Sequence, residues 1–312
     1  MTDKENALHL DSDSKRLFPD GWYTDVKQTA TVIQEFFTYS FFRTGKSEKK
    51  NKLLFNFPDG KFLETIGYVN STDQQVFMIF LDYARDNYQS MKIGNIVYDR
   101  VVIIPRREML EILGMPRHKG SYSQMVMNSL KRLKALVITH NLYKKIKESI
   151  SFFSNVGYLE TTKSFYFVIS PEFERLHERL YLKNYNLQDY LELENSLARN
   201  IWLSLKILFD HPECTKSRVL TLKTILKRGG KQEWIDKAEK KDYFKSKIKN
   251  HLAPALRELE GKGRFKFEAP PPSIGKYRLN SPYKVTRIYP LPRDEKELSS
   301  DDPPALPEGT KK

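Results

Sequence analysis

Two stretches of this chain repeat the same order of predicted elements, and that repeat limits the fold more than any other feature. In each stretch a short amphipathic helix, a turn and a longer amphipathic helix precede segments with strand character. The longer helices end alike, with Leu130-Lys-Arg-Leu133 in the first and Leu256-Arg-Glu-Leu259 in the second, 126 residues apart. This order is typical of the winged helix-turn-helix. We therefore predict an α+β fold with two tandem winged-helix domains.

The first stretch begins with a helix that Ser71 or Thr72 is expected to cap and that ends near Asn87. The β-branched run at 101–104 indicates a strand, and Pro105 suits the start of a short helix that Gly114 ends. Ser121 is expected to cap the longer helix, whose buried stripe would hold Val126, Leu130 and Leu133. Strand-like segments follow at 136–146, 149–153 and 164–169, with the turn residues Asn155 and Gly157 between the last two.

The second stretch opens with an apolar stripe from Leu197 to Leu208, which predicts a long helix. Short helices are expected at 220–226 and around Trp234, before a longer helix that starts near Asp242. Pro254 lies inside that helical pattern and should kink it or force a restart there. Strict alternation predicts a strand at 264–267, and a turn at 271–275 would send a second strand back through 276–279.

These elements divide the chain into four parts. We expect a partly disordered N-terminal extension at 1–60, a first winged-helix domain at 61–182, a second at 183–289, and a disordered, proline-rich and acidic tail at 290–312. A length of 312 residues suits two domains.

Composition narrows the class of protein. Cys214 is the only cysteine, so an internal disulfide is impossible and a cysteine-based zinc site is not expected. No apolar run approaches the ~20 residues that cross a bilayer, and the polar, acidic N-terminus does not look like a secretory signal. We expect a cytoplasmic protein without membrane contact.

The positive charge lies in the part of the chain that is predicted to fold. The net charge is +14, and residues 51–290 alone carry 41 basic and 25 acidic side chains. Residues 112–147 hold eight Lys and Arg and no Asp or Glu, and residues 216–249 hold twelve basic against four acidic side chains. Charge held on a structured surface favours a polyanionic partner. The alternative is a merely solvated cationic face.

Each longer helix is a candidate for reading DNA in the major groove, where Gln and Asn can bond adenine in a bidentate manner. Lysine favours phosphate, so the second helix would supply affinity more than specificity. The alternatives are an exposed amphipathic helix and ordinary solvated hairpins. In the first domain the candidates are Lys119, Ser121, Gln124, Asn128, Lys131, Arg132 and Lys134 of the helix region, and Lys144 and Lys145 of the wing. In the second domain they are Lys241, Lys245, Lys247, Lys249, Asn250 and His251 of the helix, and Arg264, Lys266, Lys276 and Arg278 of the wing.

Catalytic signatures are missing from the sequence. Gly45-Lys46-Ser47 resembles the end of a phosphate-binding loop, but Ser40 stands where that loop requires glycine. The six histidines form no His-x-His pair, and no nucleophile-elbow or metalloprotease motif occurs. We expect no enzyme activity, no cofactor and no metal.

The chain resembles the iteron-binding replication initiators of theta-replicating plasmids, which bind repeated origin sequences through tandem winged helices. The carrying segments are Lys183-Asn-Tyr-Asn-Leu-Gln-Asp-Tyr190, the helix 197–208, and Ile248-Lys-Asn-His-Leu-Ala-Pro-Ala-Leu-Arg-Glu-Leu259. They look like the inter-domain junction, the opening helix of the second winged helix and its DNA-reading helix. The similarity covers roughly residues 65–280.

The resemblance implies binding to direct repeats in double-stranded origin DNA, opening of an AT-rich segment, and recruitment of the host's initiator and replicative helicase. It also implies that the first domain mediates dimerisation off DNA or adds DNA contacts. A winged-helix transcriptional regulator is the alternative, and it would favour one inverted repeat bound by a dimer.

Overall fold

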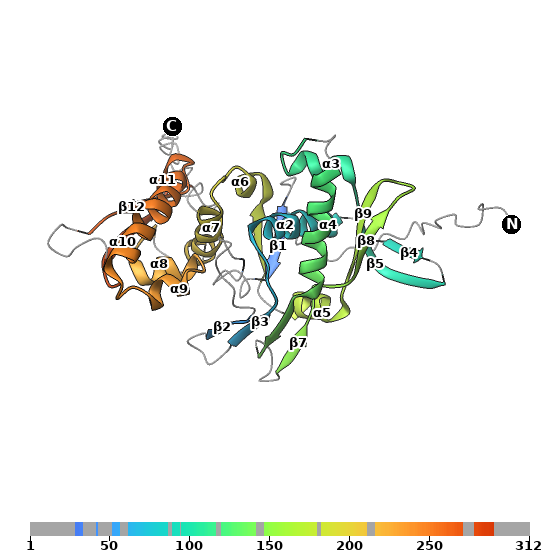
Figure 1. Ribbon diagram of the computed structural model, residues 1–312, viewed down its shortest axis with the longest axis horizontal. Helices are drawn as coiled ribbons and strands as arrows, with labels where there is room; N and C mark the ends of the chain where they lie inside the picture. The colour runs from blue at the N-terminus through green and yellow to red at the C-terminus, as the bar shows by residue number, and fades with distance from the viewer. Residues whose placement is uncertain are drawn as a thin grey trace, which may run out of the picture.

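In the computed structural model, the residues described are 29–33, 42, 52–56, 62–86, 89–93, 95–116, 120–141, 147–179, 182–210, 216–270 and 278–289. They form two lobes, with α6 and α7 between them (Figure 1). The predicted tail at 290–312 lies outside the described residues.

The first lobe is built on a winged helix-turn-helix. Its elements in chain order are α2 (Ser71–Asp86), β4 (Gln89–Ile93), β5 (Ile96–Pro105), α3 (Arg106–Ile112), α4 (Gly120–Ala135), β8 (Phe153–Leu159) and β9 (Ser164–Ile169). The antiparallel sheet has the strand order β4-β5-β9-β8, so the last strand, β9, lies between β5 and β8. Helix α4 packs against α2 and against β8.

Local chemistry explains where α2 begins. The side chain of Asn70 accepts hydrogen bonds from the backbone N–H groups of Thr72 and Asp73, at 2.9 and 3.1 Å. In the reciprocal hydrogen bond, the Asp73 carboxylate accepts from the backbone N–H of Asn70 at 2.8 Å, which completes a capping box. The cap is therefore Asn70, and the prediction that Ser71 or Thr72 caps the helix was wrong, because both lie inside it.

A second sheet combines two strands that precede α2 with two strands that lie between α4 and β8 in the chain. It consists of β2 (Lys52–Asn56), β3 (Phe62–Ile66), β6 (Val137–His140) and β7 (Glu148–Ile150), in that spatial order. Behind α2 runs a two-stranded ribbon of β1 (Thr29–Ile33) and β10 (Leu182–Asn186). In the chain, β10 comes after α5 (Pro171–Arg179). Strands β1 and β2 come from the segment that we assigned to an N-terminal extension, and both pair with later strands.

The second lobe repeats the order. After α6 (Leu187–Leu191) come α7 (Ser196–Phe209), β11 (Ser217–Thr221), α8 (Leu222–Arg228), α9 (Gln232–Asp236), α10 (Lys241–Lys247), the π-helical turn η1 (Ile248–Leu252), α11 (Ala253–Gly261), β12 (Phe265–Glu268) and β13 (Pro282–Arg287). Its sheet has the order β11-β13-β12. The last strand again lies in the middle, as β9 does between β5 and β8. This shared topology confirms the predicted tandem winged-helix fold.

Three local predictions were wrong, each because strand pairing overrode the local pattern. Residues 217–221 form β11, since they pair with β13, so the short helix starts at Leu222 and not at Leu220. The returning wing strand is β13, six residues beyond the predicted 276–279. Asn155 and Gly157 lie within β8, opposite Val168 and Tyr166 of β9, and not in a turn.

The two lobes are joined by a continuous hydrophobic core. The Tyr185 hydroxyl of β10 donates to the Leu203 carbonyl of α7 at 2.8 Å, and its ring stands edge-on to Trp202 at 5.6 Å. Asn200 of α7 donates to the carbonyl of Phe42, whose ring packs near Phe77 of α2. The junction is therefore packed through side chains and is not a loose linker.

Candidate nucleic-acid interface

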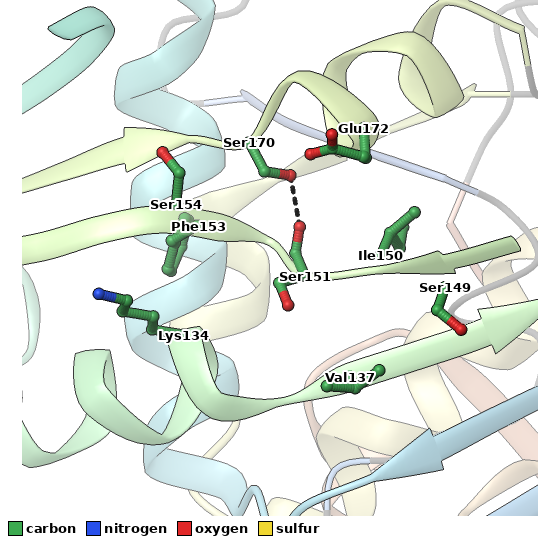
Figure 2. A pocket seen from close by; sticks show the side chains of 9 residues that line it. All are labelled: Lys134, Val137, Ser149, Ile150, Ser151, Phe153, Ser154, Ser170 and Glu172. Carbon is green, nitrogen blue, oxygen red and sulfur yellow. Dashed lines mark hydrogen bonds between the residues drawn. The ribbon is translucent and has the colours of Figure 1, made fainter.

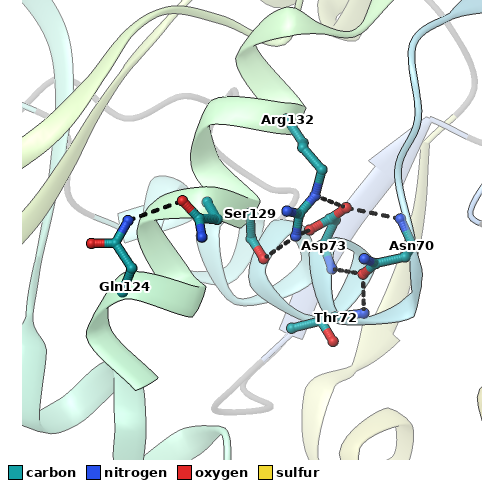
Figure 3. Close-up of polar contacts among 7 residues, drawn as sticks. Asn70, Thr72, Asp73, Gln124, Ser129 and Arg132 are labelled. Atoms are coloured by element: carbon teal, nitrogen blue, oxygen red, sulfur yellow. Dashed lines mark hydrogen bonds and ion pairs between the residues drawn. The ribbon is translucent and has the colours of Figure 1, made fainter. Parts of the chain in front are cut away.

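Helix α4 places its polar candidates on its solvent side. Ser121, Gln124, Asn128 and Lys131 are exposed, while Val126, Leu130 and Leu133 are fully buried, as the spacing predicted. The Gln124 amide nitrogen donates to the Asn128 amide oxygen at 3.0 Å (Figure 3). One turn apart on the helix, the two amides orient each other and still leave donor and acceptor atoms free for a base edge.

Arg132 is bound to an acidic side chain of α2. Its guanidinium forms a bidentate ion pair with Asp73 of α2, at 2.6 and 2.9 Å, and also donates to Ser129 at 3.2 Å (Figure 3). The Asp73 side chain is fully buried, and the hydrogen bond to it raises the pKa of Arg132 above its ordinary value. The charge of Arg132 is thus paired with Asp73 and holds α4 against α2, and its assignment to phosphate binding stays a prediction.

The remaining candidates near α4 are Lys119, Lys134, Lys144 and Lys145. Lys119, Lys144 and Lys145 lie outside the described residues. Lys134 is exposed and its ammonium group is 3.4 Å from the Asn155 amide oxygen of β8.

In the second lobe, α10, η1 and α11 together form the longer helix that is the candidate for reading DNA. Lys241, Lys245 and Lys249 are exposed, and Phe244 and Ile248 between them are buried. Lys247 is half-buried, with its ammonium group 5.5 Å from the centre of the Tyr243 ring. The structure therefore brings the three predicted lysines together on one exposed helical surface.

Asn250 and His251 lie in the π-turn and are exposed. The Asn250 amide donates to the Ser246 hydroxyl at 3.2 Å, an i to i+4 contact that sequence reasoning did not single out although the spacing shows it. Partial burial lowers the pKa of His251, and the charges of Lys247 and Lys231 lower it further. The imidazole is therefore neutral at pH 7 and can both donate and accept a hydrogen bond.

Arg264 also forms ion pairs within the protein. Its guanidinium binds Asp189 and Glu192 of the α6 region at 2.9 and 3.1 Å, lies 6.0 Å from the centre of the Trp202 ring, and is only 14% exposed. These contacts place Arg264 at the junction of the lobes, and its assignment as a wing contact to DNA stays a prediction.

The remaining wing candidates of the second lobe lie near β12 and β13. Lys266 is exposed but pairs with Glu268 at 3.2 Å, and Lys284 also reaches that carboxylate. These two cations lower the pKa of Glu268. Arg278 is exposed just before β13, and Lys276 lies outside the described residues. Part of the expected wing charge is therefore neutralised locally.

A pocket of about 400 Å³ lies beside the C-terminal end of α4 (Figure 2). Its lining combines four serines with the apolar side chains of Val137, Ile150 and Phe153, and Lys134 and Glu172 are its charged members. The Ser170 hydroxyl donates to the Ser151 carbonyl at 2.5 Å and is thus already bonded. Because one cation and one anion offset each other, the lining does not favour a phosphate.

The described residues offer neither a metal-binding cluster nor a membrane-spanning helix. Among the described residues no group of three or more His, Cys, Asp and Glu side chains is placed to hold a metal ion. Within the same part of the chain, no helix has the length and apolarity that a membrane span needs.

Three solved structures align with the chain over most of its length. A selenomethionine derivative of domains 2 and 3 of RctB has a TM-score of 0.47 at 10% identity, and the alignment covers 82% of this chain and 98% of that one. A second structure of RctB domains 2–3 has a TM-score of 0.46 at 13% identity, covering 82% and 96%. The Pi initiator protein in complex with iteron DNA has a TM-score of 0.45 at 10% identity, covering 61% and 82%.

One initiator protein bound to iteron DNA is thus among the chain's structural neighbours. No family model and no curated protein sequence matches the chain. Because all three TM-scores lie below 0.5, we draw neither fold nor function from these likenesses.

Proposed function

We propose that this protein binds double-stranded DNA in a sequence-specific manner through both winged helices and initiates plasmid replication from repeated origin sites. The observation that carries the proposal is that each lobe presents the exposed face of its longer helix with side chains suited to DNA. These are the paired amides of Gln124 and Asn128 in the first lobe and Lys241, Lys245 and Lys249 in the second. An α-helix of this kind fits the major groove.

The arrangement of the two lobes favours direct repeats. The winged helices differ in surface chemistry and are joined by a packed junction, so one chain has no two-fold symmetry and would cover an asymmetric site. Copies bound side by side would then follow repeats of one orientation. A dimeric regulator would instead require an inverted repeat.

Binding would be followed by steps at the origin. Bound copies would promote opening of a neighbouring AT-rich segment and would recruit the host's initiator and replicative helicase, and the protein would act in the cytoplasm as a binding protein and not as an enzyme. Off DNA, two copies would associate as a homodimer.

The first experiment selects duplexes from a random-sequence pool with the full-length protein and measures binding by fluorescence anisotropy across salt concentrations. We expect an asymmetric preferred sequence and a logarithmic slope of affinity against salt that corresponds to about 6–10 phosphate contacts. Selection of an inverted repeat would favour the transcriptional regulator. If no duplex is bound even at low salt, the proposal fails.

A further inference from the structure

The second reading helix is interrupted where its candidate base contacts lie. In η1 the Ala253 N–H donates to the Ile248 carbonyl, five residues back instead of four. Residues 249–251, between the buried Ile248 and Leu252, are all exposed. Such π-turns are frequent at functional sites.

The apolar spacing explains why the turn is there. Phe244, Ile248, Leu252 and Leu256 are all buried and follow one another in steps of four residues. In an α-helix each four-residue step advances about 40° beyond a full turn, so three steps would carry the stripe away from the core. A wider π-turn takes up more residues per turn and keeps all four side chains on the buried face.

Pro254 also disfavours a regular α-helix in this segment. Proline has no N–H to offer the Asn250 carbonyl four residues back, and its ring would collide with that carbonyl in a regular helix. The kink that Pro254 predicted from the sequence is therefore realised as the π-turn just before it.

The half of the helix beyond the turn is held firmly in the lobe. The Glu258 carboxylate of α11 accepts the backbone N–H groups of Glu194 and Asn195, at 2.5 and 3.1 Å, beside the start of α7. The half before the turn, α10, has only Phe244 buried among its residues. The rotation of the lysine-bearing half relative to the anchored half is consequently set by η1.

We propose that η1 determines the base preference of the second lobe, by fixing the rotation at which Asn250 and His251 meet the base edges while Lys241 and Lys245 contact phosphates. This inference rests on the proposed DNA-binding function. An amide and a neutral imidazole side by side offer donors and acceptors for the major-groove edge of a base pair.

The decisive variant is deletion of Asn250. The buried stripe would then follow steps of four and three residues, so the core no longer requires a wider turn and is expected to stay packed, with Pro254 accommodated by a local kink. The matched control is Asn250→Ala, which loses the same side chain but keeps the π-turn. Pro254→Ala is a second variant, because it restores an N–H for the Asn250 carbonyl without removing a candidate contact.

The measurement is the ratio of Kd for a scrambled duplex to Kd for a duplex that the wild-type protein selects from a random pool. Deletion of Asn250 should lower this ratio at least tenfold more than Asn250→Ala does, with less than a threefold change in Kd for the scrambled duplex. Pro254→Ala should lower it about threefold, in line with a modest loss of base discrimination.

Equal ratios for the deletion and for Asn250→Ala would overturn the inference. If circular dichroism shows that the deletion variant is unfolded, the test rests on Pro254→Ala. An unchanged ratio of the two Kd values in Pro254→Ala then overturns the inference. Failure of the wild-type protein to bind any duplex is a different result, since it removes the proposed function and this inference with it.

Discussion

Helix α4 and the α10–η1–α11 helix occupy the same place in the two winged helices, but they differ in shape and in exposed chemistry. Helix α4 runs unbroken through Gly120–Ala135 and exposes a hydrogen-bonded pair of neutral amides. Its counterpart is broken by a π-turn and exposes a row of lysines. The same scaffold can thus carry either neutral groups suited to bases or cations suited to phosphates.

Each lobe has one candidate arginine that forms ion pairs within the protein. Arg132 is bound to Asp73 in the first lobe, and Arg264 is bound to Asp189 and Glu192 in the second. In both lobes the planar guanidinium fixes the packing of neighbouring elements, whereas Lys241, Lys245 and Lys249 stay exposed. A basic residue in a cationic stretch is therefore not always an unpaired cation.

The largest expected effect is on the lysine surface of the second lobe. Lys245→Glu combined with Lys249→Glu should weaken duplex binding about 100-fold near 0.1 M salt and flatten the salt dependence, because two phosphate contacts become repulsive. The measurement is fluorescence anisotropy over a salt series. Lys92→Glu with Arg175→Glu is the matched control, since it makes the same change of net charge at exposed sites on β4 and α5. Equal weakening by both pairs would mean that total charge and not this helix matters.

The next prediction separates packing from binding on α4. Arg132→Met should lower the free energy of unfolding by about 2 kcal/mol, because it leaves the buried carboxylate of Asp73 unpaired while Arg132 itself is one-third exposed. Its Kd for duplex DNA should change less than threefold. Neighbouring Lys131→Met should do the reverse, with weaker DNA binding and unchanged stability. Urea unfolding and anisotropy check both, and a large loss of affinity in Arg132→Met would identify Arg132 as a DNA contact.

A smaller effect is expected for the amide pair. Asn128→Ala should reduce discrimination between a selected and a scrambled duplex about tenfold, since a good bidentate contact contributes about 1–3 kcal/mol. Binding to the scrambled duplex should stay nearly constant. Lys134→Ala, at an exposed position of the same helix, is the control and should weaken both duplexes equally. Uniform weakening by Asn128→Ala would identify Asn128 as a phosphate contact instead.

The smallest effect concerns pH. Burial, Lys247 and Lys231 hold the pKa of His251 below its ordinary value in the free protein, whereas a nearby phosphate would raise it in the complex. Binding would then take up a proton, so affinity should rise about threefold as the pH falls from about 7.5 to 6. His251→Gln should flatten this profile. An unchanged pH dependence in that variant would place His251 away from the phosphates.

Much of the framework could be predicted because it depends on neighbours along the chain. The stripes through Val126, Leu130 and Leu133 and through Phe244 and Ile248 set which faces are buried, and Pro105 and Pro254 mark local breaks. Helical periodicity needs only residues three or four positions apart, so the order of elements and the exposed candidates followed from the sequence.

Tertiary structure alone decided which charges remain available and which segments pair. Arg132 and Asp73 are 59 residues apart, Arg264 and Asp189 are 75 apart, and β11 becomes a strand only because β13 lies beside it. The π-turn likewise reflects a core that requires three successive four-residue steps on one face. Ion pairs and strand pairing join residues that no local pattern links, and for that reason they become visible only when the chain is folded.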